Sequence, residues 1–226
     1  MFIKKDTRKV PEIIADETDD RETMLLARRE AEFIHGLGVL CHVKNTPRLQ
    51  SLRVLSLYGN QLHSIDGIES LQHSPLEELN LGFNQLTVLS PGLGDISTLE
   101  TLWVDDNKLT TFPPCVLRLT NLKVLRLSNN NIDVVPNEFH KLPSLELVAV
   151  DNNNLAEIPS TLYELKHLET LIIRGNRIQT LSKEIGTMKN LKFLQASSNE
   201  IEIIPEELGT LTKLATIYLN SNNISK

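Results

Sequence analysis

Residues 122–136 read LKVLRLSNNNIDVVP, and this stretch decides the fold because the chain repeats it. Leucine stands at its first, fourth and sixth positions, Asn at the ninth, and apolar residues at the eleventh and fourteenth. The frame starts again every 23 residues, at Leu145, Leu168 and Leu191. A fixed period of about 20–50 residues indicates a repeat architecture. Further copies start at Leu52, Leu76, Leu99 and Leu214, which makes eight copies, the last one cut short.

Each copy begins with a short stretch in which apolar and polar residues alternate. In residues 124–128, Leu125 and Leu127 would face inward and their neighbours would face the solvent. This period of two is that of a β-strand. Strands that run in the same direction pair in parallel, and each parallel pair needs a crossover to return the chain. The rest of each copy supplies that crossover, so stacked copies bury a core that one copy alone could not.

The frame resembles that of the leucine-rich repeat family, from Leu52 to Ile224. The first copy, with IDGIESL at residues 65–71, is more similar to the class typified by a protein phosphatase regulator. Later copies resemble the intracellular 23-residue class that includes the Ras-group leucine-rich repeat proteins. They share its proline after the apolar run, at Pro113, Pro136, Pro159 and Pro205. The resemblance implies an α/β solenoid, a right-handed β-α superhelix with a parallel concave sheet, and a role as a scaffold or regulator in signal transduction.

The ninth position of every copy is Asn, a residue that normally prefers surfaces and turns. These residues are Asn60, Asn84, Asn107, Asn130, Asn153, Asn176, Asn199 and Asn222. We expect each amide to turn inward and bond free backbone groups at the turn after the strand, which would build a structural Asn ladder. The ladder should be fully bonded, because a buried unpaired polar group costs about 1–3 kcal/mol. The alternative is a row of amides that bind a ligand.

The sequence before the repeats divides into two parts. Residues 1–18 separate basic from acidic side chains, so we expect a mobile tail. Residues 19–51 would form an N-terminal helical cap, with a helix from Asp19 or Asp20 to about His35 that covers the first core edge. The alternatives are a docking motif in the tail and a helix that binds a partner. Residues 52–226 hold the eight repeats.

Composition excludes several classes of function. The net charge of −6 disfavours nonspecific binding to nucleic acid or acidic membranes. No apolar run approaches the ~20 residues of a membrane helix. Cys41 and Cys115 are the only cysteines, and the N-terminus lacks the apolar core of a secretion signal. We therefore expect an intracellular, cytoplasmic protein in a reducing compartment.

No catalytic constellation emerges from the sequence. The six histidines lack the spacing of metal ligands, and Cys115 is interpreted as a packed thiol rather than a nucleophile. The acidic stretches at 105–106 and 151–154 lack the spaced glycine and terminal Glu of a calcium loop. No run of the Gly-x-x-x-x-Gly-Lys type is present to hold a phosphate. We expect no enzyme activity, no cofactor and no metal.

The side chains that flank the inward strand leucines would form the exposed surface of the sheet, which we call the concave face. Five of the ten aromatic residues map to this face or its rim. Aromatic residues and Arg are enriched where proteins bind each other. The predicted partner-binding residues are Tyr58, Phe83, Trp103, Asp105, Arg126, Leu147, Asp151, Ile172, Arg174, Phe193 and Tyr218. Strands ~4.8 Å apart would make this row long enough for a protein or peptide. The alternative is that the aromatics merely reflect strand propensity.

The eighth copy stops at Lys226 before its crossover. Its strand would present a bare edge, which natural proteins usually protect. Three explanations stay open: a fragment of a longer protein, an end-to-end homodimer, or an edge that is tolerated. We expect an intracellular protein–protein interaction module whose partner is neither nucleic acid nor membrane. The alternative is the targeting domain of a larger enzyme, such as a kinase or ubiquitin ligase, that continues beyond this residue.

Overall fold

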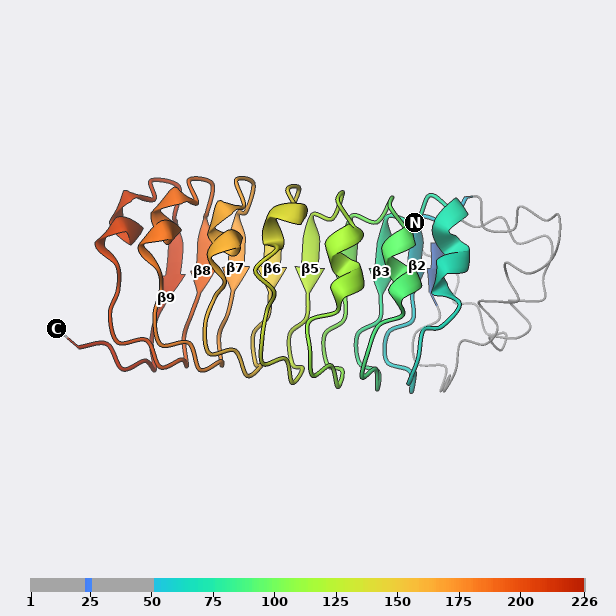
Figure 1. Ribbon diagram of the computed structural model, residues 1–226, viewed down its shortest axis with the longest axis horizontal. Helices are drawn as coiled ribbons and strands as arrows, with labels where there is room; N and C mark the ends of the chain where they lie inside the picture. Colours follow the sequence, from blue (N-terminus) through green and yellow to red (C-terminus); the bar gives the residue numbers. More distant parts are fainter. Residues whose placement is uncertain (1–22, 26–50, 226) are drawn as a thin grey trace.

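The computed structural model describes residues 23–25 and 51–225. These residues form one sheet of nine parallel strands that follow the order of the chain. The strands stand side by side along the long axis of the molecule (Figure 1). Their bounds are β1 Thr23–Leu25, β2 Val54–Ser56, β3 Glu78–Asn80, β4 Thr101–Trp103, β5 Val124–Arg126, β6 Leu147–Ala149, β7 Thr170–Ile172, β8 Phe193–Gln195 and β9 Thr216–Tyr218.

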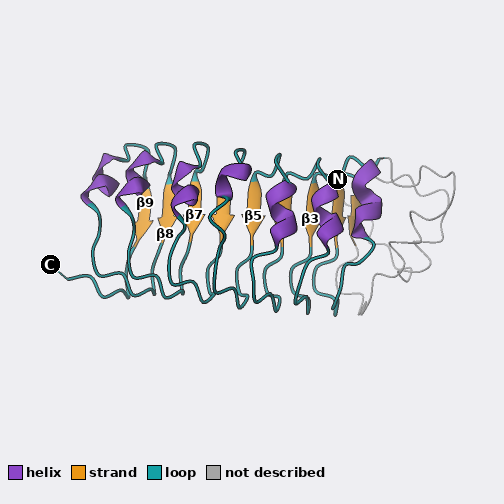
Figure 2. Cartoon of the chain, viewed as in Figure 1, coloured by secondary structure: helices purple, strands orange, loops and turns teal. Residues whose placement is uncertain are grey.

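Each crossover from β2 to β9 contains a short 3-10 helix, and the described residues contain no α-helix. The helices repeat at the same level of successive copies (Figure 2). In a 3-10 helix, side chains three residues apart lie on one side, which suits pairs such as Val116 and Leu119. The bounds are η1 Ile68–His73, η2 Pro91–Asp95, η3 Pro114–Arg118, η4 Phe139–Lys141, η5 Ser160–Glu164, η6 Lys183–Thr187 and η7 Glu206–Thr210.

One continuous apolar core lies between the sheet and the crossovers, from Leu52 to Leu211. Leu125 of β5, Leu127 just after it and Val116 of η3 are closed off from solvent. Equivalent positions pair strand to strand, as Leu102 does with Leu125. The predicted solenoid with a parallel sheet is confirmed.

The predicted N-terminal helix is wrong at Thr23–Leu25, because these residues form strand β1. They pair in parallel with β2, with Met24 opposite Leu55. The first copy of the frame would otherwise leave the backbone N–H and C=O groups of β2 without partners, and β1 binds that edge. The remainder of the predicted helix, the predicted tail over 1–18 and the rest of the predicted cap lie outside the described residues.

The amide of Asn130 shows how the ninth position joins two copies. Its Oδ1 accepts the N–H of Leu109 at 3.0 Å, and its Nδ2 donates to the carbonyls of Val104 and Leu127 at 3.0 and 3.1 Å. The carbonyl of Leu127 also accepts from the next ladder residue, Asn153, at 3.0 Å. The same bonds to the preceding copy recur at Asn84, Asn107, Asn153, Asn176, Asn199 and Asn222. Asn60, in the first copy, donates to the carbonyl of Leu57 at 2.8 Å.

A left-handed residue precedes every ladder Asn. The eighth position has a positive φ in all eight copies, between 51° at Asn152 and 67° at Gly59. This turn swings the chain out of the strand and points the next side chain inward. Gly, Asn and Asp tolerate the left-handed region best, because larger side chains clash there with the following carbonyl.

We predict that Asn130→Ala lowers the free energy of unfolding by about 2–3 kcal/mol, because the buried N–H of Leu109 loses its acceptor. Thermal and chemical denaturation would measure the loss. The matched control is Asn131→Ala at the exposed neighbouring residue, which should change stability by less than about 0.5 kcal/mol. An unchanged melting curve for Asn130→Ala would count against a structural ladder.

Candidate functional site

The strands present the predicted concave face as alternation requires. In β4, for example, Leu102 is buried, and Thr101 and Trp103 are half-buried on the other side of the sheet. Pairing places Trp103 next to Arg126 of β5 and Asn80 of β3. The indole therefore lies on the surface opposite the core and does not pack between layers.

Five of the predicted partner-binding residues come together around one hollow of about 250 Å³. They are Tyr58, Phe83, Trp103, Asp105 and Arg126. The hollow exists partly because Gly82 occupies a position that carries a side chain in every other copy. A methyl group added there would meet the side chains of Asn80 and Tyr58 at 3.2 and 3.3 Å. The hollow has the size of one or two side chains of a partner.

Phe83 carries the least expected feature of this surface. It holds the left-handed eighth position with φ 55°, where the other copies use Gly, Asp, Asn or Ser. Phe83 is 51% exposed, and its ring packs against that of Tyr58, with centroids 5.0 Å apart and an interplanar angle of 51°. A bulky residue in this region costs about 1–2 kcal/mol. The fold bears that cost and gains an exposed aromatic ring.

Asp105 forms the polar side of the hollow. Its Oδ2 lies 2.9 Å from Nε of Arg126, and its Oδ1 accepts the N–H of Ser128 at 3.0 Å. Burial raises the pKa of the Asp105 carboxyl, and the charge of Arg126 and the hydrogen bonds from Ser128 only partly offset that effect. The Ser128 hydroxyl donates to Asp151. The two predicted carboxylates are thus joined through Ser128.

The other predicted residues lie away from the hollow. Leu147 and Ile172 are half-buried on β6 and β7, while between them Ala149 is only 1% exposed and adds almost no surface. Arg174 is exposed and forms no ion pair with any described residue. Phe193 and Tyr218 form a second aromatic pair, with centroids 5.9 Å apart, at the far end of the sheet. The row therefore has two aromatic clusters rather than one continuous strip.

Four contributors to the site were not among the predicted partner-binding residues. Asn80, Gly82 and Asp106 line the hollow, and Ser128 is 2% exposed and bridges the two carboxylates. The signal for Gly82 was present in the alignment of the copies, because it is the only glycine at the seventh position. The role of Ser128 depends on carboxylates from the copies on either side and has no local signal.

The described residues contain no cluster of three or more His, Cys, Asp or Glu side chains arranged to hold a metal ion. Cys115 is a free, buried cysteine, and burial raises the pKa of its thiol to about 11. Such a thiol is protonated at neutral pH and is a poor nucleophile. Among the residues that the structure describes, no helix has both the length and the apolar character needed to cross a membrane.

Comparisons with known proteins agree with this geometry. A family model described as Leucine rich repeat matches residues 97–155 and 160–224, and a model for two copies of the repeat matches residues 50–91. No curated protein gives a significant sequence match.

Solved structures share the fold over most of this chain. An internalin (inlF) from Listeria monocytogenes superposes with a TM-score of 0.71 at 23% identity, covering 79% of this chain and 51% of the internalin. A TDR receptor superposes with a TM-score of 0.77 at 26% identity, covering 89% of this chain and 35% of the receptor chain. A third match is the leucine-rich repeat ectodomain of the receptor kinase GASSHO1/SCHENGEN3 from Arabidopsis thaliana, solved in complex with CASPARIAN STRIP INTEGRITY FACTOR 2. Its TM-score is 0.68 at 26% sequence identity, and the match covers 83% of this chain and 25% of the ectodomain. The chain spans between a quarter and about half of these proteins.

We predict that Phe83→Asn keeps or raises the free energy of unfolding, by up to about 1 kcal/mol, because Asn tolerates the left-handed backbone better. The reverse change at the equivalent position, Asn129→Phe, should destabilise the protein by about 1 kcal/mol. Urea denaturation of both variants would measure the pair. A loss of more than about 1 kcal/mol in Phe83→Asn would show that the ring serves the fold instead of the surface.

Proposed function

This chain belongs to the leucine-rich repeat family, and from that premise we propose that it binds a partner protein through its concave face. The observation that carries the proposal is the strained, half-exposed ring of Phe83 beside Tyr58 and Trp103. Backbone strain of this kind concentrates at functional sites, where the surrounding structure holds it in place. Nothing in the turn itself requires an aromatic side chain, since the other copies do without one.

The chemistry of the hollow supports a protein partner over a small metabolite. Aromatic side chains and Arg dominate the centres of protein interfaces. The hollow of about 250 Å³ is smaller than the ~300–1,000 Å³ of a typical small-molecule pocket. It suits one anchoring side chain of a partner, whose other contacts would lie along the rows through Leu147, Ile172 and Phe193.

An anchoring side chain of the partner would contact the aromatic rings of the hollow and the ion pair between Arg126 and Asp105. Arg126 is already engaged by Asp105, so it offers donors to the partner only on its remaining side. Arg174 is the freer cation of the face and would receive an acidic group. The anchor in the hollow is therefore proposed to be apolar or aromatic, with an acidic residue further along toward β7.

We further propose that the protein acts inside the cell as a signalling scaffold or regulator. Support comes from the resemblance of its 23-residue copies to the Ras-group proteins and of its first copy to the phosphatase-regulator class. The unpaired, buried thiol of Cys115 suits a reducing compartment. The alternative is the targeting domain of a larger enzyme, such as a kinase or ubiquitin ligase. A longer reading frame that encodes a catalytic motif would favour that alternative.

The end-to-end homodimer remains a proposal, supported by the exposure of core positions in the eighth copy. Ile217 is 39% exposed, whereas its counterpart in the preceding copy, Leu194, is 0% exposed. Ile224 is 41% exposed, and its counterpart Ile201 is 0% exposed. A second copy that packs against these side chains would bury them.

For the partner site, we predict that Trp103→Ala and Arg126→Ala each weaken binding about tenfold or more, because both side chains frame the hollow. Affinity capture and mass spectrometry would identify the partner, and calorimetry on purified components would give the affinities. Lys166→Ala, which removes an exposed cation from the crossover after η5, is the matched control and should bind like the unaltered protein. Unchanged affinity in folded Trp103→Ala protein would remove this site from consideration.

For the dimer, light scattering over a wide concentration range should show an increase in mass that Ile217→Lys abolishes, because a charge at a buried contact is costly. Gln179→Lys, at an exposed residue of the sixth copy, adds the same charge away from the eighth copy and should leave the association intact. A strict monomer at high concentration would dispose of the homodimer.

A further inference from the structure

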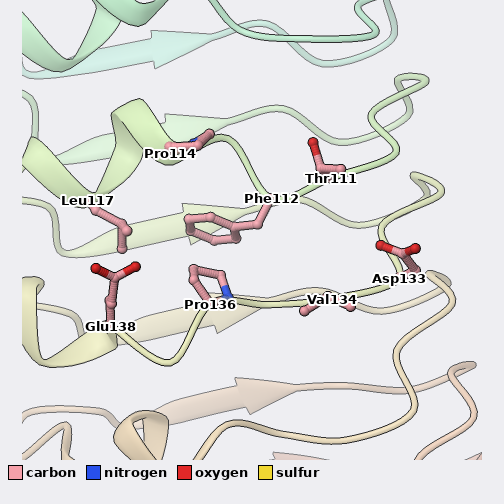
Figure 3. Close-up of a pocket in the computed structure, with 8 residues that line it drawn as sticks. All are labelled: Thr111, Phe112, Pro114, Leu117, Asp133, Val134, Pro136 and Glu138. Atoms are coloured by element: carbon pink, nitrogen blue, oxygen red, sulfur yellow. The ribbon is translucent and has the colours of Figure 1, made fainter.

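A second hollow, of about 240 Å³, lies on the crossover side of the solenoid between the third and fourth copies. We call it the crossover slot. One wall consists of Phe112, Pro114 and Leu117 of the third copy, and the other consists of Val134 and Pro136 of the fourth (Figure 3). Phe112, Val134 and Pro136 lie between a strand and the helix that follows it, whereas Pro114 and Leu117 belong to η3. None of the five belongs to the concave face.

The slot opens because the fourth helix starts late. Helices η2, η3, η5, η6 and η7 all begin at the sixteenth position of their copies, but η4 begins at the eighteenth, Phe139. The residue at the sixteenth position, Asn137, is bonded to the fifth copy instead. Asn137 Oδ1 accepts the hydroxyl of Ser160 at 3.2 Å and the N–H of Thr161 at 3.3 Å. This leaves the side of η3 that carries Leu117 uncovered.

Aromatic packing holds the floor of the slot in place. The buried rings of Phe112 and Phe139 meet edge to face, with centroids 5.6 Å apart at 62°. Such a pair fixes the spacing of the two segments, and the proline rings restrict the backbone of both walls and offer no N–H to a neighbour. The slot is therefore a rigid apolar surface that exists before any ligand arrives.

The rim of the slot combines an exposed apolar side chain with negative charge. Val134 is 67% exposed. An exposed position does not require an apolar side chain, so this valine is available for contact with a ligand. Figure 3 shows Glu138 at the end beside Leu117 and Asp133 toward the opposite end. Lys141 pairs with Glu138 at 2.7 Å, and Asp133 forms no ion pair with any described residue. A basic ligand would thus complement the rim.

We propose that the crossover slot docks an extended segment of a partner protein in which an apolar side chain is flanked by Lys or Arg. The apolar side chain would fill the space between the two proline walls, and the flanking cations would reach the two carboxylates. Asp133 and Glu138 are five residues apart, so at most roughly 18 Å of chain separates them. Basic residues two positions before and after the apolar residue span roughly 13 Å and fit this distance.

The test uses the full chain and the acetylated, amidated peptide Lys-Ala-Leu-Ala-Lys, followed by nuclear magnetic resonance of the ¹⁵N-labelled protein. The expected result is saturable shifts confined to residues 111–117 and 133–138, with a Kd of about 1 mM or tighter. Two further peptides separate the contributions: Glu-Ala-Leu-Ala-Glu reverses the charge, and Lys-Ala-Ser-Ala-Lys removes the apolar anchor. Both should bind at least about tenfold more weakly.

The matched variants are Val134→Lys and Val88→Lys. Both residues occupy the thirteenth position of their copies and are 67% and 65% exposed, so neither change threatens the fold. Only Val134 lines the slot. Val134→Lys should weaken the peptide at least about tenfold, whereas Val88→Lys and Trp103→Ala should leave its affinity unchanged. Shifts that do not saturate, equal binding of the acidic peptide, or equal loss in both valine variants would overturn the proposal.

Discussion

The hydrogen bonds of the ninth-position amides are the constraint on which the rest of the structure depends. Each amide after the first accepts a hydrogen bond from an N–H of the preceding copy and donates one to a carbonyl of that copy. Most carbonyls at the sixth position accept from two successive amides. A turn that leaves a strand has unpaired backbone groups, and burial makes such groups costly. Because the amides satisfy them only when consecutive copies are in register, the ladder sets the register and brings the leucines of successive copies into one core.

The ladder also leaves the outward positions free to vary. Once the turn is secured by Asn and by a left-handed eighth residue, the concave face can carry any side chain that faces solvent. At Phe83 the variation extends into the turn itself, against the preference of the backbone. The neighbouring Gly82 departs in the opposite direction by removing a side chain. Together these two departures turn a regular row into a hollow with an aromatic rim.

On the crossover side, irregularity arises from the helices. The strands repeat almost identically, whereas η4 starts two residues later than its neighbours because Asn137 is bonded to the fifth copy. A solenoid tolerates such a change, since each copy contacts mainly its two neighbours. The concave hollow is lined by residues of the first four copies and the crossover slot by residues of the third and fourth, so the two lie close together along the solenoid on different surfaces.

The sequence alone determined the number of copies, the inward leucines, the ladder positions and which side chains share the concave face, because all of these follow from periodicity. It failed at Thr23–Leu25, where a local helical pattern gave no sign that the edge of β2 lacked a partner. Tertiary structure alone decided the hollow, the Ser128 bridge between Asp105 and Asp151, and the slot opened by Asn137. Each of these joins residues about 23 positions apart through side-chain contacts, and such contacts depend on how copies stack rather than on the pattern within one copy.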